Sequence, residues 1–259
     1  MTTTSSRFPV KRLPDGRAFI NLGSSARGHL GWNNVDFNWI VRLGKYPRLY
    51  HLLYRRGLLS VERYRRLQQM DPSTVVWDLR KGIPFADATF DGAYHCHVLE
   101  HIDREAAPVF IRECHRVLKP NGILRVVVPD FEYLARHYIG CVDRLPDNAD
   151  MEEHLFRVSE MIDQMVIRTP RDRQGRPRII RFAENIILGD TAKNGALHRW
   201  MYDRFSLAEL LRECGFVDIR QQDATSSYIS DWAEFHLDTE PDGTIYKPGS
   251  LYIEGRREG

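Results

Sequence analysis

Short continuous runs of apolar residues alternate along this chain with longer segments in which apolar and polar residues mix. The run "ILRVVVPD" at residues 123–130 is typical of a strand buried on both faces of a parallel sheet. Other runs are shorter, rich in β-branched or aromatic residues, and end at turn residues. We expect strands at residues 18–23, 33–37, 74–79, 90–99, 123–130, 217–222 and 249–257.

The segments between several of these strands have the pattern of amphipathic helices. In residues 103–118 the apolar positions fall on one face of a helix, which Pro120 and Gly122 then end. Further helices are expected at residues 131–139, 151–168 and 206–216. Strands that alternate with helices imply a parallel sheet covered on both faces. We therefore predict an α/β fold with a doubly wound, mostly parallel, seven-stranded sheet.

Two segments interrupt the alternation. Residues 39–70 have a helical pattern broken by Pro47 and Gly57, which predicts a helical insertion. Residues from about 135 to 200 are the natural candidate for an insertion that covers a substrate. Residues 1–17 have no apolar core and are expected to form a mobile lead-in, so residues 18–259 are predicted to form the functional domain.

Composition adds limits on the class of protein. The 259 residues are 42% hydrophobic and 28% charged, which is typical of one soluble domain with an insertion. No apolar run approaches the roughly 18 residues that a membrane span needs. The four cysteines are scattered and fit reduced thiols in a cytoplasmic protein.

The net charge of +2 argues against a general binder of polyanions, although the charge is unevenly distributed. Residues 41–66 hold eight Arg or Lys against one acidic residue, and residues 168–181 hold six Arg against one. These patches are either solvated surfaces or contacts for phosphates or an acidic substrate.

Chemically useful residues fall at the ends of the predicted strands. In a doubly wound sheet, ligands bind at the carboxyl ends of the strands. Gly23 lacks a Cβ and would let the backbone approach a ligand closely. Asp36 could accept hydrogen bonds from both ribose hydroxyls, and Asp78 from an adenine amino group beside an apolar wall at Leu79. These positions suit a nucleoside ligand.

The sequence resembles class I S-adenosylmethionine-dependent methyltransferases of the small "type 11" kind. The resemblance lies in "INLGSS", "GWNNVDF", "WDLRKGIPFADATFDGAYHCHVLEHI", "ECHRVLKPNGILRVVVPD", "HRWMYDRFSLAELLRECGF" and "GSLYIEGR". It implies S-adenosylmethionine as cofactor. The cofactor-binding residues expected are Leu22, Gly23, Ser24, Ser25, Asp36, Asp78, Leu79, His95 and His97.

The chain departs from the family at the glycine loop. Asn21 stands where the family often has an acidic residue, and Ser25 where it often has a second glycine. Gly23 and Asp36 are only 13 positions apart, too close for a full helix between the strands. A dinucleotide needs that helix terminus for its phosphates, whereas a sulfonium nucleoside has no phosphate.

Methyl transfer to a hydroxyl group requires a base, and histidine can take a proton near neutral pH. We expect His198 or His97 to be this base, with Tyr202 and Asp203 reaching over the acceptor. His95 is expected near the methionine part of the cofactor. His101 is better explained by packing, and His137 and His154 are outside candidates.

A metal ion is a further option, because some related methyltransferases bind a diol acceptor through Mg²⁺. Asp130 follows the fifth strand, where one such carboxylate would lie. Glu132 and Asp203 could supply further oxygen ligands. A lone carboxylate in such a loop is more often a helix cap.

The expected acceptor is a hydroxyl group on a sugar or small metabolite, since resembling proteins act on such compounds. Aromatic platforms for such an acceptor could come from Trp32, Trp39, Trp200 and Trp232. Two alternatives stay open: a nucleic-acid methyltransferase that uses the Arg-rich patches, and a non-catalytic module that binds the cofactor. We expect no membrane partner, consider nucleic acid the weaker option, and leave a homo-oligomer open.

Overall fold

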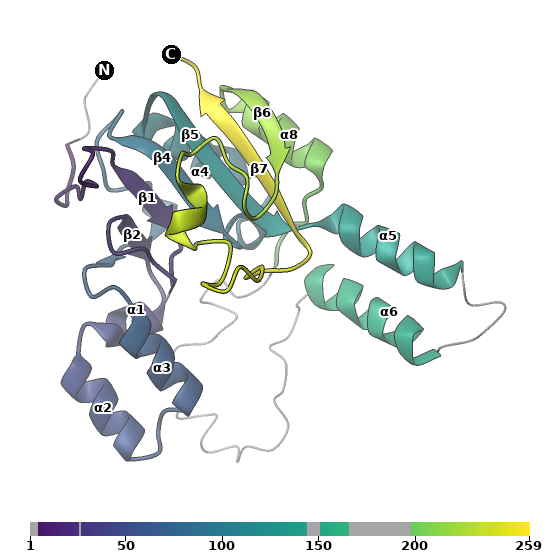
Figure 1. The fold of residues 1–259 in the computed structure, drawn as a ribbon, viewed down its shortest axis with the longest axis horizontal. Coiled ribbons are helices and arrows are strands. Elements are labelled where there is room, and N and C mark those ends of the chain that lie inside the picture. Colours follow the sequence, from purple (N-terminus) through teal and green to yellow (C-terminus); the bar gives the residue numbers. More distant parts are fainter. Residues whose placement is uncertain (1–4, 26, 144–150, 166–197) are drawn as a thin grey trace.

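The computed structural model describes residues 5–25, 27–143, 151–165 and 198–259. Its centre is a seven-stranded sheet with the order β3-β2-β1-β4-β5-β7-β6 (Figure 1). The strands are β1 (Phe19–Leu22), β2 (Asn33–Asp36), β3 (Val75–Val76), β4 (Phe90–Cys96), β5 (Leu118–Pro129), β6 (Phe216–Gln222) and β7 (Ser250–Arg257). All neighbouring strands from β3 to β5 pair in parallel, and only β7 runs antiparallel to its neighbours. The predicted fold class is confirmed.

The helices fall into three groups along the chain. The first group lies between β2 and β3, the second follows β4, and the third lies beyond β5. The α-helices are α1 (Trp39–Gly44), α2 (Pro47–Arg55), α3 (Val61–Gln69), α4 (Ala107–Val117), α5 (Phe131–Val142), α6 (Met151–Met165) and α8 (Arg204–Glu213). Short 3₁₀ turns are η1 (Leu79–Lys81), η2 (Leu99–His101) and η3 (Trp232–Phe235). No helix of the described part is long and apolar enough to cross a membrane.

One face of the sheet is covered by α4 and α8. The buried face of α4 includes Phe110, Ile111 and Cys114, which join the main hydrophobic core. Leu207 and Leu211 of α8 enter the same core. Burial of these side chains is the main source of stability for this layer, because apolar surface leaves water there.

The opposite face is covered largely by the chain between β6 and β7, which carries η3 (Figure 1). Trp32 is fully buried and stacks on Phe19, with ring centroids 4.8 Å apart. Trp232 of η3 packs edge-on against Trp32 at 6.0 Å. Both tryptophans are therefore core residues and do not provide platforms for an acceptor.

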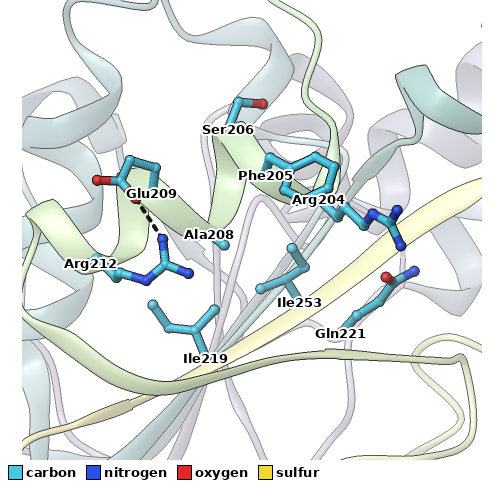
Figure 2. Close-up of a pocket in the computed structure, with 9 residues that line it drawn as sticks. All are labelled: Arg204, Phe205, Ser206, Ala208, Glu209, Arg212, Ile219, Gln221 and Ile253. Carbon is cyan, nitrogen blue, oxygen red and sulfur yellow. Dashed lines mark hydrogen bonds and ion pairs between the residues drawn. The ribbon is translucent and has the colours of Figure 1, made fainter.

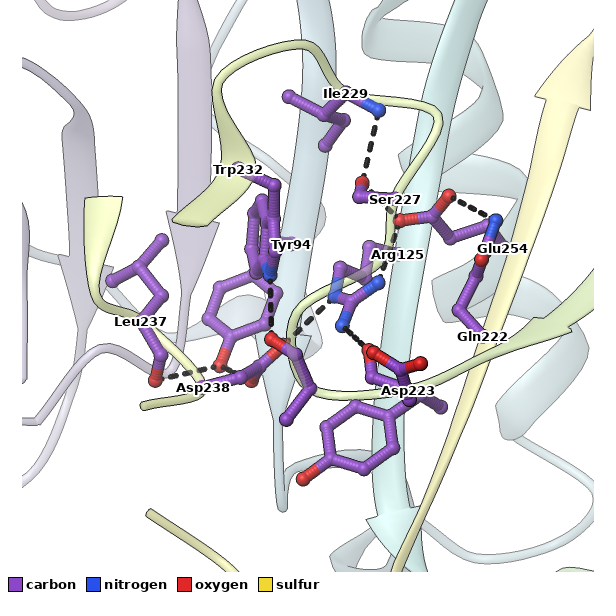
Figure 3. A network of polar contacts seen from close by, with 12 residues as sticks. Tyr94, Arg125, Gln222, Asp223, Ser227, Ile229, Trp232, Leu237, Asp238 and Glu254 are labelled. Atoms are coloured by element: carbon purple, nitrogen blue, oxygen red, sulfur yellow. Dashed lines mark hydrogen bonds and ion pairs between the residues drawn. The ribbon is translucent and has the colours of Figure 1, made fainter. Parts of the chain in front are cut away.

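A buried charged network fixes this covering segment to the sheet (Figure 3). Arg125 of β5 donates hydrogen bonds to Asp238 and Glu254, each at 2.8 Å. The Tyr94 hydroxyl of β4 donates to Asp238 at 2.6 Å. Arg125 also donates to the backbone carbonyls of Ser226 and Asp223, at 2.9 and 2.6 Å. Through Tyr94 of β4, Arg125 of β5 and Glu254 of β7, the network thereby joins three strands to the segment above them.

The segment predicted as a helical insertion, residues 39–70, contains α1, α2 and α3. Tyr50, Leu59 and Leu67 form a small separate core between them. The segment predicted to cover a substrate, about 135–200, includes parts of α5 and all of α6, which lie side by side (Figure 1). Residues 144–150 and 166–197 lie outside the described residues, so the covering role stays a prediction.

The strand predicted at residues 74–79 is wrong beyond Val76, because only Val75 and Val76 pair with β2. The preceding hydroxyl, that of Thr74, donates to the carbonyl of Asp71 at 2.7 Å. The following residues bend into the 3₁₀ turn η1, for which Asp78 is the N-cap. Leu79 therefore lies in a turn, partly buried against the main core.

Candidate functional site

The loop after β1 is held between two other strand ends. The backbone N–H groups of Gly23 and Ser24 both donate to the carbonyl of Val35 in β2, at 2.8 and 3.2 Å. Gly23 has a φ of +73°, and a Cβ atom at this position would overlap the side chain of Val98. Glycine is therefore required here both by the backbone conformation and by the close approach of the segment after β4.

No helix occurs in the described residues between β1 and β2, as the short spacing predicts. The Ser24 side chain is buried, and its hydroxyl has no hydrogen-bond partner among the residues that the structure describes. Buried hydroxyl groups are normally paired. An unpaired donor on the glycine loop is consistent with a ligand that supplies the partner.

Asp36 ends β2 and faces this loop. Its carboxylate accepts hydrogen bonds from the backbone N–H groups of Ser25 and Asn38, both at 2.7 Å. Burial raises the pKa of Asp36, and these two hydrogen bonds oppose that rise. Each carboxylate oxygen has a second lone pair, so the arrangement leaves acceptor capacity for ribose hydroxyls.

Asp78 lies at the same edge of the sheet as Asp36. The backbone carbonyl of Asp36 accepts a hydrogen bond from the N–H of Trp77 at 3.0 Å, which joins the two strand ends. The Asp78 carboxylate is paired with the guanidinium of Arg80 at 2.9 and 2.8 Å, and this pairing lowers the pKa of Asp78. The contact of Asp78 with an adenine amino group stays a prediction. In that contact the guanidinium of Arg80 would lie beside the adenine.

His95 lies in β4 and is fully buried. Its ring packs edge-on against Phe110 of α4 with centroids 5.3 Å apart, and neither ring nitrogen has a hydrogen-bond partner. Burial lowers the pKa of His95 to about 3, so the imidazole is neutral. Its predicted role near the methionine part of the cofactor stays a prediction.

The most distinctive group at the strand ends is what we call the histidine cluster: His97, Glu100, His101, His198 and Tyr202. The first three come from the segment after β4, and the last two from the segment before α8. The backbone carbonyl of Glu100 accepts hydrogen bonds from the N–H groups of Arg199 and Trp200, at 2.6 and 3.3 Å. This backbone pairing brings together residues that are 100 positions apart.

His97 is held in place from two sides. Its Nε2 atom lies 2.9 Å from the Ser250 hydroxyl, and its Nδ1 atom lies 3.4 Å from Oε1 of Glu100. Burial lowers the pKa of His97 to about 3, and Lys247 and the neighbouring histidines add to the effect. The ring is therefore neutral at physiological pH and presents a lone pair.

Glu100 was not among the residues predicted from sequence. Its side chain is 0% exposed, and within the described part of the chain neither carboxylate oxygen has a hydrogen-bond partner. Burial raises the pKa of Glu100 to about 8. The spacing of "HVLEH", residues 97–101, places one carboxylate between two histidines and is the signal that could have pointed to it.

Tyr202 and Asp203 take different positions. Tyr202 is buried, its hydroxyl has no hydrogen-bond partner, and burial raises its pKa to about 12. Asp203 is the N-cap of α8 and accepts from the N–H groups of Phe205 and Ser206 at 3.1 and 2.7 Å. The carboxylate of Asp203 is thus used by the helix terminus, and its role over an acceptor stays a prediction.

The carboxylates expected to hold Mg²⁺ have local partners. Asp130 is the N-cap of α5 and accepts from the N–H of Glu132 at 2.9 Å. Glu132 is paired with Arg136 at 2.7 Å and with Arg204 at 3.2 Å. These contacts explain Asp130 and Glu132 without a metal ion, and Mg²⁺ at this place stays a prediction.

A pocket of about 560 Å³ lies between α8, the edge strand β6 and its neighbour β7 (Figure 2). An ion pair between Arg212 and Glu209, at 2.5 Å, lies on one side of it, and Ile219 and Ile253 form its apolar floor. None of its lining residues belongs to the glycine loop or to the histidine cluster. The pocket is therefore separate from the candidate site.

Residues 53–126 match the family model described as "Methyltransferase domain". The matched segment runs from α2 into β5 and contains Asp78, His97 and Glu100. The resemblance predicted from the sequence is confirmed by this match. No curated protein matches the chain at a significant level.

The chain is also similar to solved structures at low identity. A putative methyltransferase from Haloferax volcanii, in complex with the Trm112 methyltransferase activator, has 15% identity and a TM-score of 0.41 over 98% of this chain and 86% of that chain. 1,6-Didemethyltoxoflavin-N1-methyltransferase from Burkholderia thailandensis has 17% identity and a TM-score of 0.40, over 94% of this chain and 73% of that chain. The methyltransferase SibL has 13% identity and a TM-score of 0.41, over 94% of this chain and 51% of that chain. This chain therefore spans about half the length of SibL. Because these scores are low, the fold assignment rests on the strand order of this chain.

Proposed function

We propose that this chain, which carries the methyltransferase-domain match, transfers a methyl group from S-adenosylmethionine to a hydroxyl group on a sugar or small metabolite. The observation that supports this most is the contact between Gly23 and Val98. It places the predicted cofactor loop directly against the segment that carries His97 and Glu100. A cofactor half and an acceptor half of one site would thereby be neighbours.

The residues at the first strand ends fit a nucleoside cofactor. Ser24 offers an unpaired buried hydroxyl, and Asp36 offers carboxylate lone pairs beside it. S-adenosylmethionine, when bound, supplies a methyl group on a positively charged sulfur that is already activated for transfer. Leu22, Gly23, Ser25, Asp78 and Leu79 complete the proposed cofactor side.

On the acceptor side, the chain has to position a hydroxyl group and take its proton. Nε2 of His97, which contacts the Ser250 hydroxyl at 2.9 Å, is in reach of an oxygen at the same place. The ring is neutral, as a general base must be before it accepts a proton, and the lowered pKa makes it a weak base in the unliganded protein. His198 is the alternative base, since it lies beside His101 with ring centroids 4.9 Å apart.

The surroundings of His198 also fit a flat or sugar-like acceptor. Trp200 is 37% exposed, and the guanidinium of Arg104 lies 4.4 Å from its ring centroid. An exposed aromatic ring near a base can stack against a sugar face. Trp200 is the tryptophan of the predicted set that we retain as a platform next to the histidine cluster.

Two observables test this proposal. Calorimetric titration with S-adenosylmethionine measures cofactor binding, and release of S-adenosylhomocysteine from a panel of sugars, phenols and amines measures transfer. Binding with release from hydroxyl acceptors supports the proposal. Binding without release from any acceptor supports the alternative of a non-catalytic module, and release from amines alone would overturn O-methylation.

The nucleic-acid alternative depends on the two Arg-rich segments. Residues 168–181 lie outside the described residues. Within residues 41–66, Arg66 is paired with Glu62 at 2.7 Å on the exposed side of α3. Binding of RNA or DNA that weakens steeply with salt would favour this alternative.

A further inference from the structure

We propose that Glu100, His101 and His198 bind a divalent transition-metal ion at the carboxyl end of β4. One ligand atom from each of these side chains lies within 4.8 Å of the others. Within the described residues, groups of three or more His, Cys, Asp or Glu side chains with ligand atoms this close together are limited to this one. It is distinct from Asp130, the position at which Mg²⁺ is expected from the sequence.

The environment of Glu100 points to a cation independently of the ligand geometry. The side chain is 0% exposed, and neither of its oxygens receives a hydrogen bond from the described residues. A carboxylate removed from water in this way is costly unless it keeps a proton or a positive partner compensates it, and a bound cation would be such a partner. Two imidazole nitrogens lie close to Oε1: Nδ1 of His97 at 3.4 Å and Nε2 of His101 at 3.9 Å. Neither contact has the geometry of a hydrogen bond.

The three side chains need only small movements to close around an ion. Ligands about 2.1 Å from a tetrahedral ion lie about 3.4 Å from one another. The rings of His101 and His198 have centroids 4.9 Å apart and planes at 66°, so rotation of the side chains can bring their nitrogens together. The backbone hydrogen bond from Arg199 to Glu100, at 2.6 Å, already holds the two segments in place.

The donor set selects the class of ion. Two imidazole nitrogens and one carboxylate oxygen suit Mn²⁺, Fe²⁺, Co²⁺ or Zn²⁺, whereas Mg²⁺ prefers oxygen ligands. Three protein ligands leave an open coordination position, as in catalytic metal sites. If the proposed function holds, an ion bound next to His97 would orient the acceptor oxygen and lower its pKa.

The direct test is titration of the full chain with Co²⁺ after treatment with a chelator. No cofactor or acceptor is present, so the result does not depend on whether the proposed function is correct. We expect visible d–d absorption that saturates and that Zn²⁺ removes by competition, whereas Mg²⁺ leaves it unchanged. An absence of d–d absorption, or displacement by equimolar Mg²⁺, would overturn the proposal.

Variants locate the site. E100Q keeps the shape of the side chain and removes its charge, and H101A removes a nitrogen ligand at a partly exposed position. We expect each to weaken Co²⁺ binding by about 100-fold or more, because a metal with three ligands loses one of them. The matched control is H137Q, which removes a partly buried histidine on α5 whose Nδ1 contacts the carbonyl of Tyr133 at 2.8 Å. Equal Co²⁺ affinity in E100Q, H101A and H137Q would contradict the assignment.

H198A tests the ligand that comes from the second segment. Circular dichroism establishes whether this variant folds, and H198N replaces it if the alanine variant does not. Loss of the Co²⁺ spectrum in a folded His198 variant supports the site. An unchanged spectrum would show that His198 is not a ligand and would overturn the three-residue assignment.

Discussion

Nε2 of His97 lies 2.9 Å from the hydroxyl of Ser250, the first residue of β7, although 153 positions separate the two residues. On the other side of the ring, Nδ1 lies 3.4 Å from the buried carboxylate of Glu100. The ring is thus fixed between a hydroxyl group and a carboxylate at the end of the central strands. This arrangement is the basis for the proposed role of His97.

We predict that H97N lowers the rate of methyl transfer by about 10²–10⁴-fold, the usual contribution of a general base. Asparagine is the suitable replacement because His97 has a φ of +53°, a conformation that Asn tolerates better than most residues. Cofactor affinity, measured by calorimetry, is expected to stay within a factor of about three, because the base contacts the acceptor. Full activity in H97N together with loss of activity in H198N would assign the base to His198 instead.

S250A should have a smaller effect. It removes the hydroxyl partner of Nε2 but leaves the ring and its contact with Glu100. We expect transfer to fall by roughly 10-fold, as when a hydrogen bond of about 1–1.5 kcal/mol that orients a group is lost. A decrease as large as that of H97N would mean that Ser250 itself takes part in the chemistry.

Gly23 offers a test of the close approach between the cofactor loop and Val98. G23A places a Cβ into the Val98 side chain at a position with a φ of +73°, so we expect a loss of stability well above the cost of the backbone conformation alone. That backbone cost is about 1 kcal/mol. The matched control is G57A, since Gly57 has a φ of +69° and nothing within 4 Å of an added Cβ.

Urea unfolding of G23A, G57A, V98A and the double variant G23A/V98A measures both effects. The double variant should recover part of the stability lost in G23A, because the overlapping methyl groups are gone. If G23A and G57A lower the free energy of unfolding by the same amount, the contact with Val98 does not contribute to stability.

The network around Arg125 is predicted to support the fold and to have no part in the site. R125M would leave Asp238 and Glu254 as buried carboxylates without their cation, which should lower the free energy of unfolding by roughly 3–5 kcal/mol. Urea unfolding measures this loss. The control R66A removes an exposed pair with Glu62 and should change stability by no more than about 0.5 kcal/mol. A small effect of R125M on the free energy of unfolding would contradict this role. It would mean that the cost of removing the charged groups from water cancels the gain from pairing them.

Asp71 should make stability depend on pH. Burial opposes its ionisation, but hydrogen bonds from Lys11, Ser73 and Asn34 together lower its pKa in the folded state. A folded pKa below the unfolded value of about 3.9 means that the stabilising contribution is present at neutral pH and is lost as the pH falls through this range. The melting temperature of D71N should therefore fall less steeply with acidification than that of the wild type. Parallel curves would contradict this role.

Much of the fold could be predicted because the sheet strands leave a strong signal. The continuous apolar run in β5 and the amphipathic pattern of α4 correspond directly to buried positions. β3 was predicted too long, because the apolar run at residues 74–79 includes Trp77 and Leu79, which leave the sheet as the chain turns. The pattern of apolar and polar residues alone does not predict that turn.

The site was predictable only in part, for a physical reason. Gly23 follows β1 directly and Asp36 is the last residue of β2, so their places at the carboxyl ends of the strands are set by local sequence. Glu100 stands between two histidines in "HVLEH", but the sequence does not show that its side chain is buried or that its backbone carbonyl pairs with Arg199 and Trp200, far along the chain. Asp203 likewise could not be separated from a site residue, since helix caps and site carboxylates are the same residue type.

The central claim is that Asp36 and the glycine loop bind S-adenosylmethionine, and calorimetric titration of the wild type and D36N tests it most directly. We predict saturable binding by the wild type and an affinity reduced by about 10–100-fold in D36N, because a carboxylate that accepts hydrogen bonds from hydroxyl groups contributes about 1.5–3 kcal/mol. D78N should lose less, since Asp78 is already paired with Arg80. No heat of binding to the folded wild-type protein, or equal affinities of the wild type and D36N, would contradict the account.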